Sequence, residues 1–200
     1  NISSSWINDT VTGVHTNDGF LELHDVGIGS KSTGCHVNLP SEYPADPVME
    51  LNDVRMNHDW EDSGIVVEGV SLDFDIELHA DLSTESTYSP LDRTRNDEKG
   101  ALILDITGSG ASTAEIHLTV KECPGHGLAV LNWPSSGSLH LDPQSRIRNV
   151  ELDGINIGDH INITIDANQI YNPGLSSIFG GDDNKVTIIE GQSQTMKFDA

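Results

Sequence analysis

Basic residues, aromatic rings and long apolar runs are all scarce in this chain of 200 residues. It has 10 Lys and Arg against 32 Asp and Glu, so its formal net charge at pH 7 is −22. A surface this anionic repels phosphate groups, so we expect neither nucleic acid nor anionic lipid as a partner. No apolar run approaches the roughly 20 residues that a transmembrane helix needs, so we expect no membrane span. Salt screens such self-repulsion, which favours a saline setting and a halophilic source such as an archaeon.

Cysteine is also scarce, with only Cys35 and Cys123 present. In a secreted β-domain the two cysteines predict a single disulfide. Closing so long a loop would stabilise the fold by about 4 to 5 kcal/mol in the chain-entropy model. A zinc site is the alternative, because Cys35-His36 and Cys123-Pro124-Gly125-His126 together supply two sulfur and two nitrogen ligands. Neither segment has the paired-cysteine spacing that is typical of a zinc knuckle.

The sequence has no recognisable catalytic motif. It contains no H-E-x-x-H peptidase motif and no G-x-S-x-G nucleophile turn, and its nine histidines are dispersed along the chain. We therefore assign no catalytic residue and no metal ligand, and we expect a protein that is not an enzyme. Calcium is the one cofactor left open, because the loops at residues 153–159 and 180–184 are rich in the oxygen ligands that it prefers. An ordinary turn is the alternative for both loops.

The chain does have a clear alternation of apolar and polar residues. The longest case runs through Leu72, Asp73, Phe74, Asp75, Ile76, Glu77, Leu78 and His79. Alternation with a period of two is typical of a strand with one buried face. Parallel strands buried on both faces read as continuous apolar runs, so the alternation favours antiparallel pairing. Similar segments at residues 116–120, 161–166 and 196–198, separated by turn residues, predict an all-β fold with a single jelly-roll-like β-sandwich.

We expect one folded domain, residues 15–200, preceded by an extended N-terminal arm, residues 1–14. Inside the domain, Gly108-Ser109-Gly110 separates two strands and predicts a hairpin. The arm has too little apolar surface to order itself, but an open sheet edge accepts an added strand. The residues that would anchor the arm on a neighbouring copy are Ile2, Trp6, Ile7 and Val11. A contact of this kind is head-to-tail and propagates as a filament.

Three Asn-x-Ser/Thr tripeptides begin at Asn1, Asn8 and Asn162. Such tripeptides are acceptors for N-linked glycans in secreted proteins. They predict a glycoprotein located outside the cell or on its surface. We expect Asn162 to lie on the outward face of its strand, where a glycan can be accommodated.

Three stretches of the chain carry a resemblance to a known family. Residues 6–12 (Trp-Ile-Asn-Asp-Thr-Val-Thr) and 19–23 (Gly-Phe-Leu-Glu-Leu) are similar to its opening, F-x-D-T-x-T … F-x-A-G-x-L-D-L. Residues 51–59 (Leu-Asn-Asp-Val-Arg-Met-Asn-His-Asp) are similar to its L-x-D-V-K-P-G-D turn. Residues 191–198 (Gly-Gln-Ser-Gln-Thr-Met-Lys-Phe) are similar to its final Q-G-x-S-x-T-F-x-F. The chain therefore resembles the TasA/camelysin family of secreted biofilm fibre proteins.

This resemblance implies a jelly-roll-like domain and a structural role in a biofilm matrix fibre or a bundling pilus. In such a filament each arm completes the sheet of the next subunit, by donor-strand complementation. The partners of the chain would then be copies of itself. Two other functions remain open, a jelly-roll capsid or surface-layer protein, and a calcium-assisted carbohydrate-binding module.

Overall fold

The structure, a computed structural model, describes residues 2–16, 21–39, 48–57, 63–71, 75–83, 99–108, 113–134, 136–165, 170–171, 173–188 and 196–198. Sixteen β-strands and no helix lie in these residues. None of the segments described is therefore a helix long and apolar enough to cross a membrane. The all-β part of the predicted fold class is confirmed.

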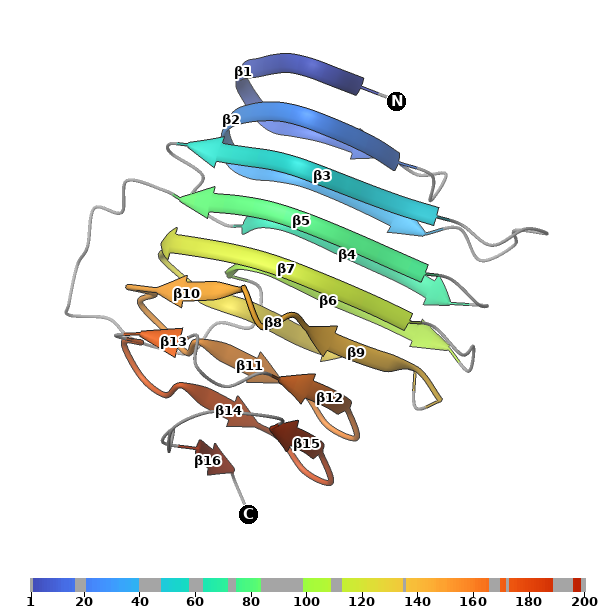
Figure 1. Ribbon diagram of the computed structural model, residues 1–200, viewed down its shortest axis with the longest axis vertical. Helices are drawn as coiled ribbons and strands as arrows, with labels where there is room; N and C mark the ends of the chain where they lie inside the picture. The colour runs from blue at the N-terminus through green and yellow to red at the C-terminus, as the bar shows by residue number, and fades with distance from the viewer. Residues whose placement is uncertain are drawn as a thin grey trace.

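The strands stack along the long axis of the molecule in two main sheets, with the two ends of the chain at opposite ends of the stack (Figure 1). The front sheet contains the first parts of β1 (Ile2–Thr16) and β2 (Leu21–Leu39), then β3 (Val48–Asn57), β5 (Asp75–Ser83), β7 (Thr113–Glu122), β9 (Ser138–Leu141), β12 (Asn162–Ile165) and β15 (Lys185–Ile188). The back sheet contains the last parts of β1 and β2, then β4 (Ser63–Ser71), β6 (Gly100–Gly108), β8 (His126–Asn132), β11 (Ile155–Ile157), β14 (Ile178–Gly180) and β16 (Met196–Phe198). A short third side is formed by β10 (Arg146–Arg148), which pairs with β7 and with β13 (Ile170–Tyr171).

The predicted antiparallel jelly-roll β-sandwich is wrong. Every strand pair in the described residues is parallel, and the chain winds as a β-solenoid in which each turn adds one rung to both sheets. Alternation favours antiparallel pairing in most proteins because parallel sheets usually have both faces covered. In a solenoid each parallel sheet has one face on the core and the other on the outside. Its strands therefore alternate just as antiparallel strands do.

The predicted hairpin is also wrong. The strands on either side of residues 108–110 are β6 and β7, and they lie in different sheets. β6 pairs with β4 and β8, whereas β7 pairs with β5, β9 and β10. Gly108 ends β6 in the back sheet, and the chain next enters the front sheet at β7, one rung further along.

The core consists of apolar columns, each made of the residues that share one register position on successive rungs. One column of the front sheet contains Ile2, Leu23, Leu51, Leu78, Ile116, Leu141, Ile165 and Ile188. One column of the back sheet contains Val14, Cys35, Ile65, Leu102, Leu128, Ile155, Ile178 and Met196. The members whose side chains are described are buried, at 9% exposure for Val14 and 1% or less for the others. Burying each such aliphatic side chain contributes about 1.5 to 3 kcal/mol, so these columns hold the rungs together.

Candidate functional site

The predicted donor arm is the first rung of its own solenoid. β1 runs through Val14 to Thr16 and pairs with β2 of the same chain, which places Ile2 beside Leu23 and Trp6 beside Gly27. Ile7 lies beside Ile28, and Val11 lies between Thr10 and Thr12, where the register shifts. Of the four predicted anchors, the structure describes the side chain of Ile7 alone, which is half-buried against the core. The boundary expected after residue 14 therefore falls inside a continuous strand.

The apolar core reaches both ends of the stack. In the part of the chain that the structure describes, two half-buried apolar side chains pack against the core, Ile7 and Val186. Ile7 belongs to β1, the first rung, and Val186 belongs to β15, on the last rung of the front sheet. Each end of the solenoid thus has an apolar side chain that no further rung covers, within the residues described.

The backbone register of the front sheet aligns polar residues in two columns. The glutamate column, defined by backbone register, contains Glu22, Glu50, Glu77 and Glu115 on successive strands and continues to His140 on β9. The histidine column lies two residues further along the same strands, where His79 on β5 pairs in register with His117 on β7. Asp142 follows directly after β9 and continues the histidine column by a contact with His117. The acid and the base therefore exchange places between β7 and β9.

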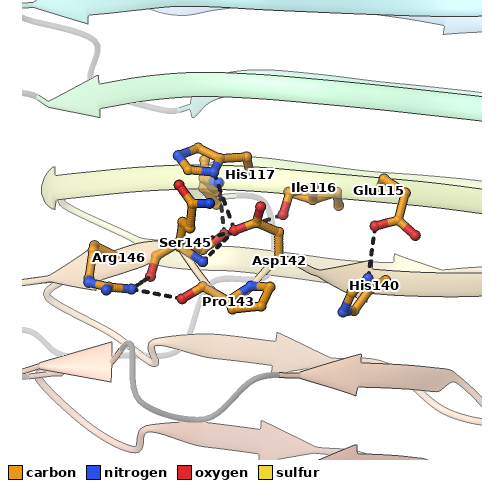
Figure 2. Close-up of polar contacts among 10 residues, drawn as sticks. Glu115, Ile116, His117, His140, Asp142, Pro143, Ser145 and Arg146 are labelled. Atoms are coloured by element: carbon orange, nitrogen blue, oxygen red, sulfur yellow. Dashed lines mark hydrogen bonds and ion pairs between the residues drawn. The ribbon is translucent and has the colours of Figure 1, made fainter. Parts of the chain in front are cut away.

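Two imidazole–carboxylate pairs result from this exchange (Figure 2). His140 Nδ1 lies 2.8 Å from Glu115 Oε2, and His117 Nδ1 lies 3.3 Å from Asp142 Oδ1. All four side chains reach solvent, with 26% exposure for His117 and 28% for Asp142. The pairs place imidazole nitrogen and carboxylate oxygen atoms side by side on a sheet face that reaches solvent.

The turn after β9 holds Asp142 in place. Its Oδ1 accepts hydrogen bonds from the backbone N–H groups of Gln144 and Ser145. The buried Ser145 hydroxyl donates to the Ile116 carbonyl at 3.2 Å and accepts from the Leu118 N–H at 3.0 Å, which ties the turn to β7. The Arg146 guanidinium donates to the Pro143 and Ser145 carbonyls and closes the other side of the turn (Figure 2).

These two columns were not predicted, although a signal for them is present in the sequence. The tripeptide Glu-x-His occurs at Glu22-Leu23-His24, Glu77-Leu78-His79 and Glu115-Ile116-His117. Glu50-Leu51-Asn52 and His140-Leu141-Asp142 are variants of it at the same register. A single histidine gives no such indication, whereas a repeated pattern with a buried middle residue indicates stacked strands that share an outer face.

The two cysteines are free and buried in the structure, so the predicted disulfide is not formed. Cys35 lies in the apolar back column on the second rung, whereas Cys123 lies at a corner after β7, on the fifth rung. Three rungs correspond to about 14 Å, and a disulfide requires Cα atoms within about 7 Å. Cys123 Sγ is already hydrogen-bonded to the His126 carbonyl and the Gly125 N–H, both at 3.3 Å. Burial raises the pKa of each thiol to about 12.

In the two loops considered as calcium sites, side-chain oxygens accept hydrogen bonds from backbone N–H groups of the protein. The Asp153 side chain is buried beside His126, and its Oδ1 accepts a 2.9 Å hydrogen bond from the Ser176 N–H. Asp159 Oδ1 accepts from the Asp182 N–H at 2.8 Å, and Asn184 Oδ1 accepts from the Ile161 N–H at 2.7 Å. Among the side chains that are described, no three His, Cys, Asp or Glu residues are grouped for a metal ion.

The three glycosylation tripeptides fall in different settings. Asn162 is exposed at the start of β12, on the outer face of the front sheet. Asn8 lies within β1, in the segment between Ile7 and Thr10 where the register shifts. Asn1 lies outside the described residues. Of the three, Asn162 has the accessible side chain that a glycan requires, and glycosylation itself stays a prediction.

Comparisons with known proteins identify no relative: no family model, no curated protein and no solved structure matches this chain. The resemblance to the TasA/camelysin family therefore stays a prediction from the three motifs.

Proposed function

We propose that this chain is a non-enzymatic structural protein that assembles outside the cell into a filament, by head-to-tail contacts between solenoids. The observation that carries the proposal is the core that runs to both ends of the stack, with Ile7 half-buried on the first rung and Val186 half-buried on the last. A second copy placed end to end would cover both residues. The anionic surface and the exposed Asn162 tripeptide are the features that favour a location outside the cell.

Parallel strands make such a contact directional. An edge strand offers unpaired backbone N–H and C=O groups, and the first rung of one copy can pair with the last rung of the next in the direction used inside each copy. The two ends are different surfaces, so the contact is heterologous and propagates without closing. In continued register, Ile188 of one copy would take the position above Ile2 of the next, because both belong to one column. The arm then contributes an edge, and it is not exchanged between subunits as donor-strand complementation would require.

Charge opposes the assembly. Each copy has a net charge of −22. The Debye length falls from about 10 Å at 0.1 M salt to about 3 Å at 1 M. Assembly should therefore strengthen as salt is added. The jelly-roll capsid that the sequence left open is not proposed, because it depended on a sandwich that the chain does not form.

The test is to block each end separately. We expect Ile7→Asp and Val186→Asp each to stop growth at 1 M NaCl, because a carboxylate at the end of the core leaves an unpaired charge in the contact. Thr187→Asp is the matched control, since it adds the same charge to the exposed face of the same strand. Light scattering and negative-stain electron microscopy measure the assembly, and circular dichroism checks that each variant is folded.

Mixing the two blocked variants gives the sharpest result. Ile7→Asp keeps an intact last rung and Val186→Asp keeps an intact first rung, so an equimolar mixture should stop at dimers in sedimentation velocity. End-to-end stacking is supported if wild-type protein and Thr187→Asp form filaments and only the mixture of blocked variants forms dimers. Monomeric wild-type protein at high concentration and 1 M salt would sink the proposal. Filament growth by folded Val186→Asp would do the same.

A further inference from the structure

A buried column of polar residues runs along the corner where the third side meets the back sheet. His126, Asp153 and Ser176 occupy the same register position on three successive rungs, because β8, β11 and β14 pair in register two residues further on. Their exposed fractions are 0%, 0% and 3%. The same position on the rung above is Gly100, which has no side chain. Acidic side chains are almost never buried so completely unless they have a partner, so the imidazole and the carboxylate form an ionisable pair enclosed by the fold.

One nitrogen of the His126 ring faces two groups of the same residue. The Asp153 backbone N–H donates to Nδ1 at 3.2 Å, and Asp153 Oδ2 lies 3.5 Å from the same nitrogen. A ring nitrogen that accepts a hydrogen bond carries no proton, so the imidazole in this arrangement is neutral, with its proton on Nε2. Asp153 Oδ1 accepts a 2.9 Å hydrogen bond from the Ser176 N–H. Oδ2 is therefore the carboxylate oxygen that faces the ring.

Protonation of His126 would exchange these two contacts. Both ring nitrogens of an imidazolium are donors, so Nδ1 could no longer accept from the Asp153 N–H and would donate to Oδ2. The proton also changes the pair from one negative charge to none. An uncompensated charge is costly where water is excluded, and a hydrogen bond between charged groups is stronger than a neutral one. We therefore expect the folded chain to hold this proton more firmly than an exposed histidine does.

Three further titratable residues lie near the pair. Cys123 Sγ donates to the His126 carbonyl at 3.3 Å, and burial raises the pKa of this thiol to about 12, so it stays neutral. The Lys99 carbonyl accepts from the His126 N–H at 2.9 Å, and the Glu151 N–H donates to the Cys123 carbonyl. Lys99 and Glu151 are half-buried and reach water. Among the residues described, Asp153 is the one acid that is fully buried, so its charge is screened least.

We propose that His126 and Asp153 form a proton-sensitive switch between two rungs. When the imidazole takes a proton from solvent, Nδ1 exchanges the backbone N–H for the carboxylate, and an ion pair links the start of β8 to the segment before β11. The proton returns to solvent as pH rises, so no further reactant is needed.

The switch makes the stability of the stack depend on pH. In the unfolded chain a histidine loses its proton at about pH 6.5. Above this value the folded chain binds more protons than the unfolded chain, so the free energy of unfolding falls as pH rises. Mild acid therefore stabilises the contact between the rungs and mild alkali weakens it, whether or not the chain assembles into filaments.

Nuclear magnetic resonance of the full-length chain tests the proposal directly. The histidine rings are isotope-labelled, and their signals are followed from pH 5 to pH 9 at low salt, where the net charge opposes assembly. We expect the titration midpoint of His126 to lie at least about one pH unit above that of His160, whose side chain is 71% exposed. The amide signal of Asp153 should shift with the same midpoint, because this N–H loses its acceptor. His126→Gln identifies the ring signal.

Two matched substitutions separate the buried contact from the general field of the protein. Asp153→Asn removes the charge and keeps an oxygen that can accept from the Ser176 N–H. It should lower the His126 midpoint to that of His160 or below. Glu151→Gln removes the same charge two residues away and should move the midpoint by much less. In urea unfolding, the wild type should lose more stability than Asp153→Asn between pH 6 and pH 8.

The titration of the wild type decides the proposal even if Asp153→Asn fails to fold. A midpoint of His126 at or below that of His160 would overturn it, whereas a ring that is still charged at pH 9 would support it. An equal effect of Glu151→Gln and Asp153→Asn on the midpoint would also overturn it, because the buried contact would then have no special role.

Discussion

Each cysteine thiol is held protonated by burial. Cys35 lies among apolar side chains, and Cys123 lies where its sulfur both donates and accepts a hydrogen bond. Both have a pKa raised to about 12, with burial as the largest cause. The thiolate is the reactive form of cysteine, so neither residue is expected to react with disulfide reagents while the protein is folded.

The raised pKa values predict a loss of stability at alkaline pH. In the unfolded chain a thiol loses its proton near pH 9, whereas in the folded chain it keeps the proton until about pH 12. The folded state then binds more protons inside this window, so the free energy of unfolding falls as pH rises through it and is unaffected below it. The decline is about 1 kcal/mol per pH unit for each thiol. Urea unfolding at pH 8, 9, 10 and 11 measures the slope.

The matched control for this prediction is Cys35→Val with Cys123→Ser. Valine suits the apolar column, and a serine hydroxyl can make the two hydrogen bonds of Cys123. This double variant should lose less stability than the wild type between pH 9 and 11. Equal slopes for the two proteins would show that the thiols do not titrate in this window. Reaction of the folded wild type with a disulfide reagent at pH 8 would contradict the burial itself.

At the scale of the strand, the corner between the back sheet and the third side depends on two stacked glycines. Gly127 is the second residue of β8, and Gly154 lies one rung below, with its carbonyl accepting from the Leu128 N–H at 3.0 Å. A Cβ atom on Gly127 would lie 2.3 Å from Ile147 Cγ2 and 2.6 Å from the Gly154 carbonyl oxygen. The absent side chain is what allows Ile147 to fill the corner.

Gly127→Ala should therefore destabilise the fold by about 1 to 3 kcal/mol, the usual cost of overpacking a core. The neighbouring backbone cannot move away, because it belongs to the next rung. Gly100→Ala is the matched control, since its Cβ would meet nothing closer than 3.3 Å. Chemical unfolding of the two variants measures the difference. An equal or larger loss for Gly100→Ala would contradict the packing described at this corner.

The strands themselves were readable from the sequence, but their partners were not. The alternation at residues 116–120 lies in β7, and Met196 and Phe198 lie in β16. Pairing is a different property, because the residues that meet are 21 positions apart for Ile2 and Leu23 but 38 apart for Leu78 and Ile116. No fixed repeat length therefore marks the rungs. Alternation fixes which face is buried, and it is the same for an antiparallel sandwich and a parallel solenoid.

Only one feature of the polar surface could be predicted from the sequence. The Glu-x-His tripeptides are visible in the sequence, and the parallel register alone aligns them on neighbouring strands. The exchange of acid and base at His140 and Asp142 depends on the short β9 and the turn that follows it. That turn is fixed by Ser145, whose two hydrogen bonds reach residues 27 and 29 positions away. Hydrogen bonds between residues so far apart in the sequence leave no local sequence pattern from which they could be predicted.

For the whole molecule, the net negative charge is an electrostatic term that opposes folding. The net charge is −22, and the glutamate column aligns Glu50, Glu77 and Glu115 on adjacent strands. Adjacent rungs are about 4.8 Å apart, and two carboxylates at that separation repel each other by about 0.9 kcal/mol in water at low salt. Unlike net charge, which acts over the entire surface, this repulsion is concentrated in a single line and should respond to a single substitution.

Glu77→Gln should raise the melting temperature at 10 mM NaCl by a few degrees, because it removes the repulsion with a glutamate on each neighbouring strand. A stability gain of about 1 kcal/mol shifts the midpoint of thermal unfolding by about 2 to 4 °C. Asp183→Asn is the matched control, since it removes one charge from an exposed turn away from the column. At 1 M NaCl, where the Debye length is about 3 Å, the advantage of Glu77→Gln over Asp183→Asn should shrink toward zero. Thermal unfolding of the wild type and both variants at the two salt concentrations measures it. Equal stabilisation by the two substitutions at low salt would mean that the repulsion is spread over the molecule. The parallel register of the glutamates would then have no energetic consequence.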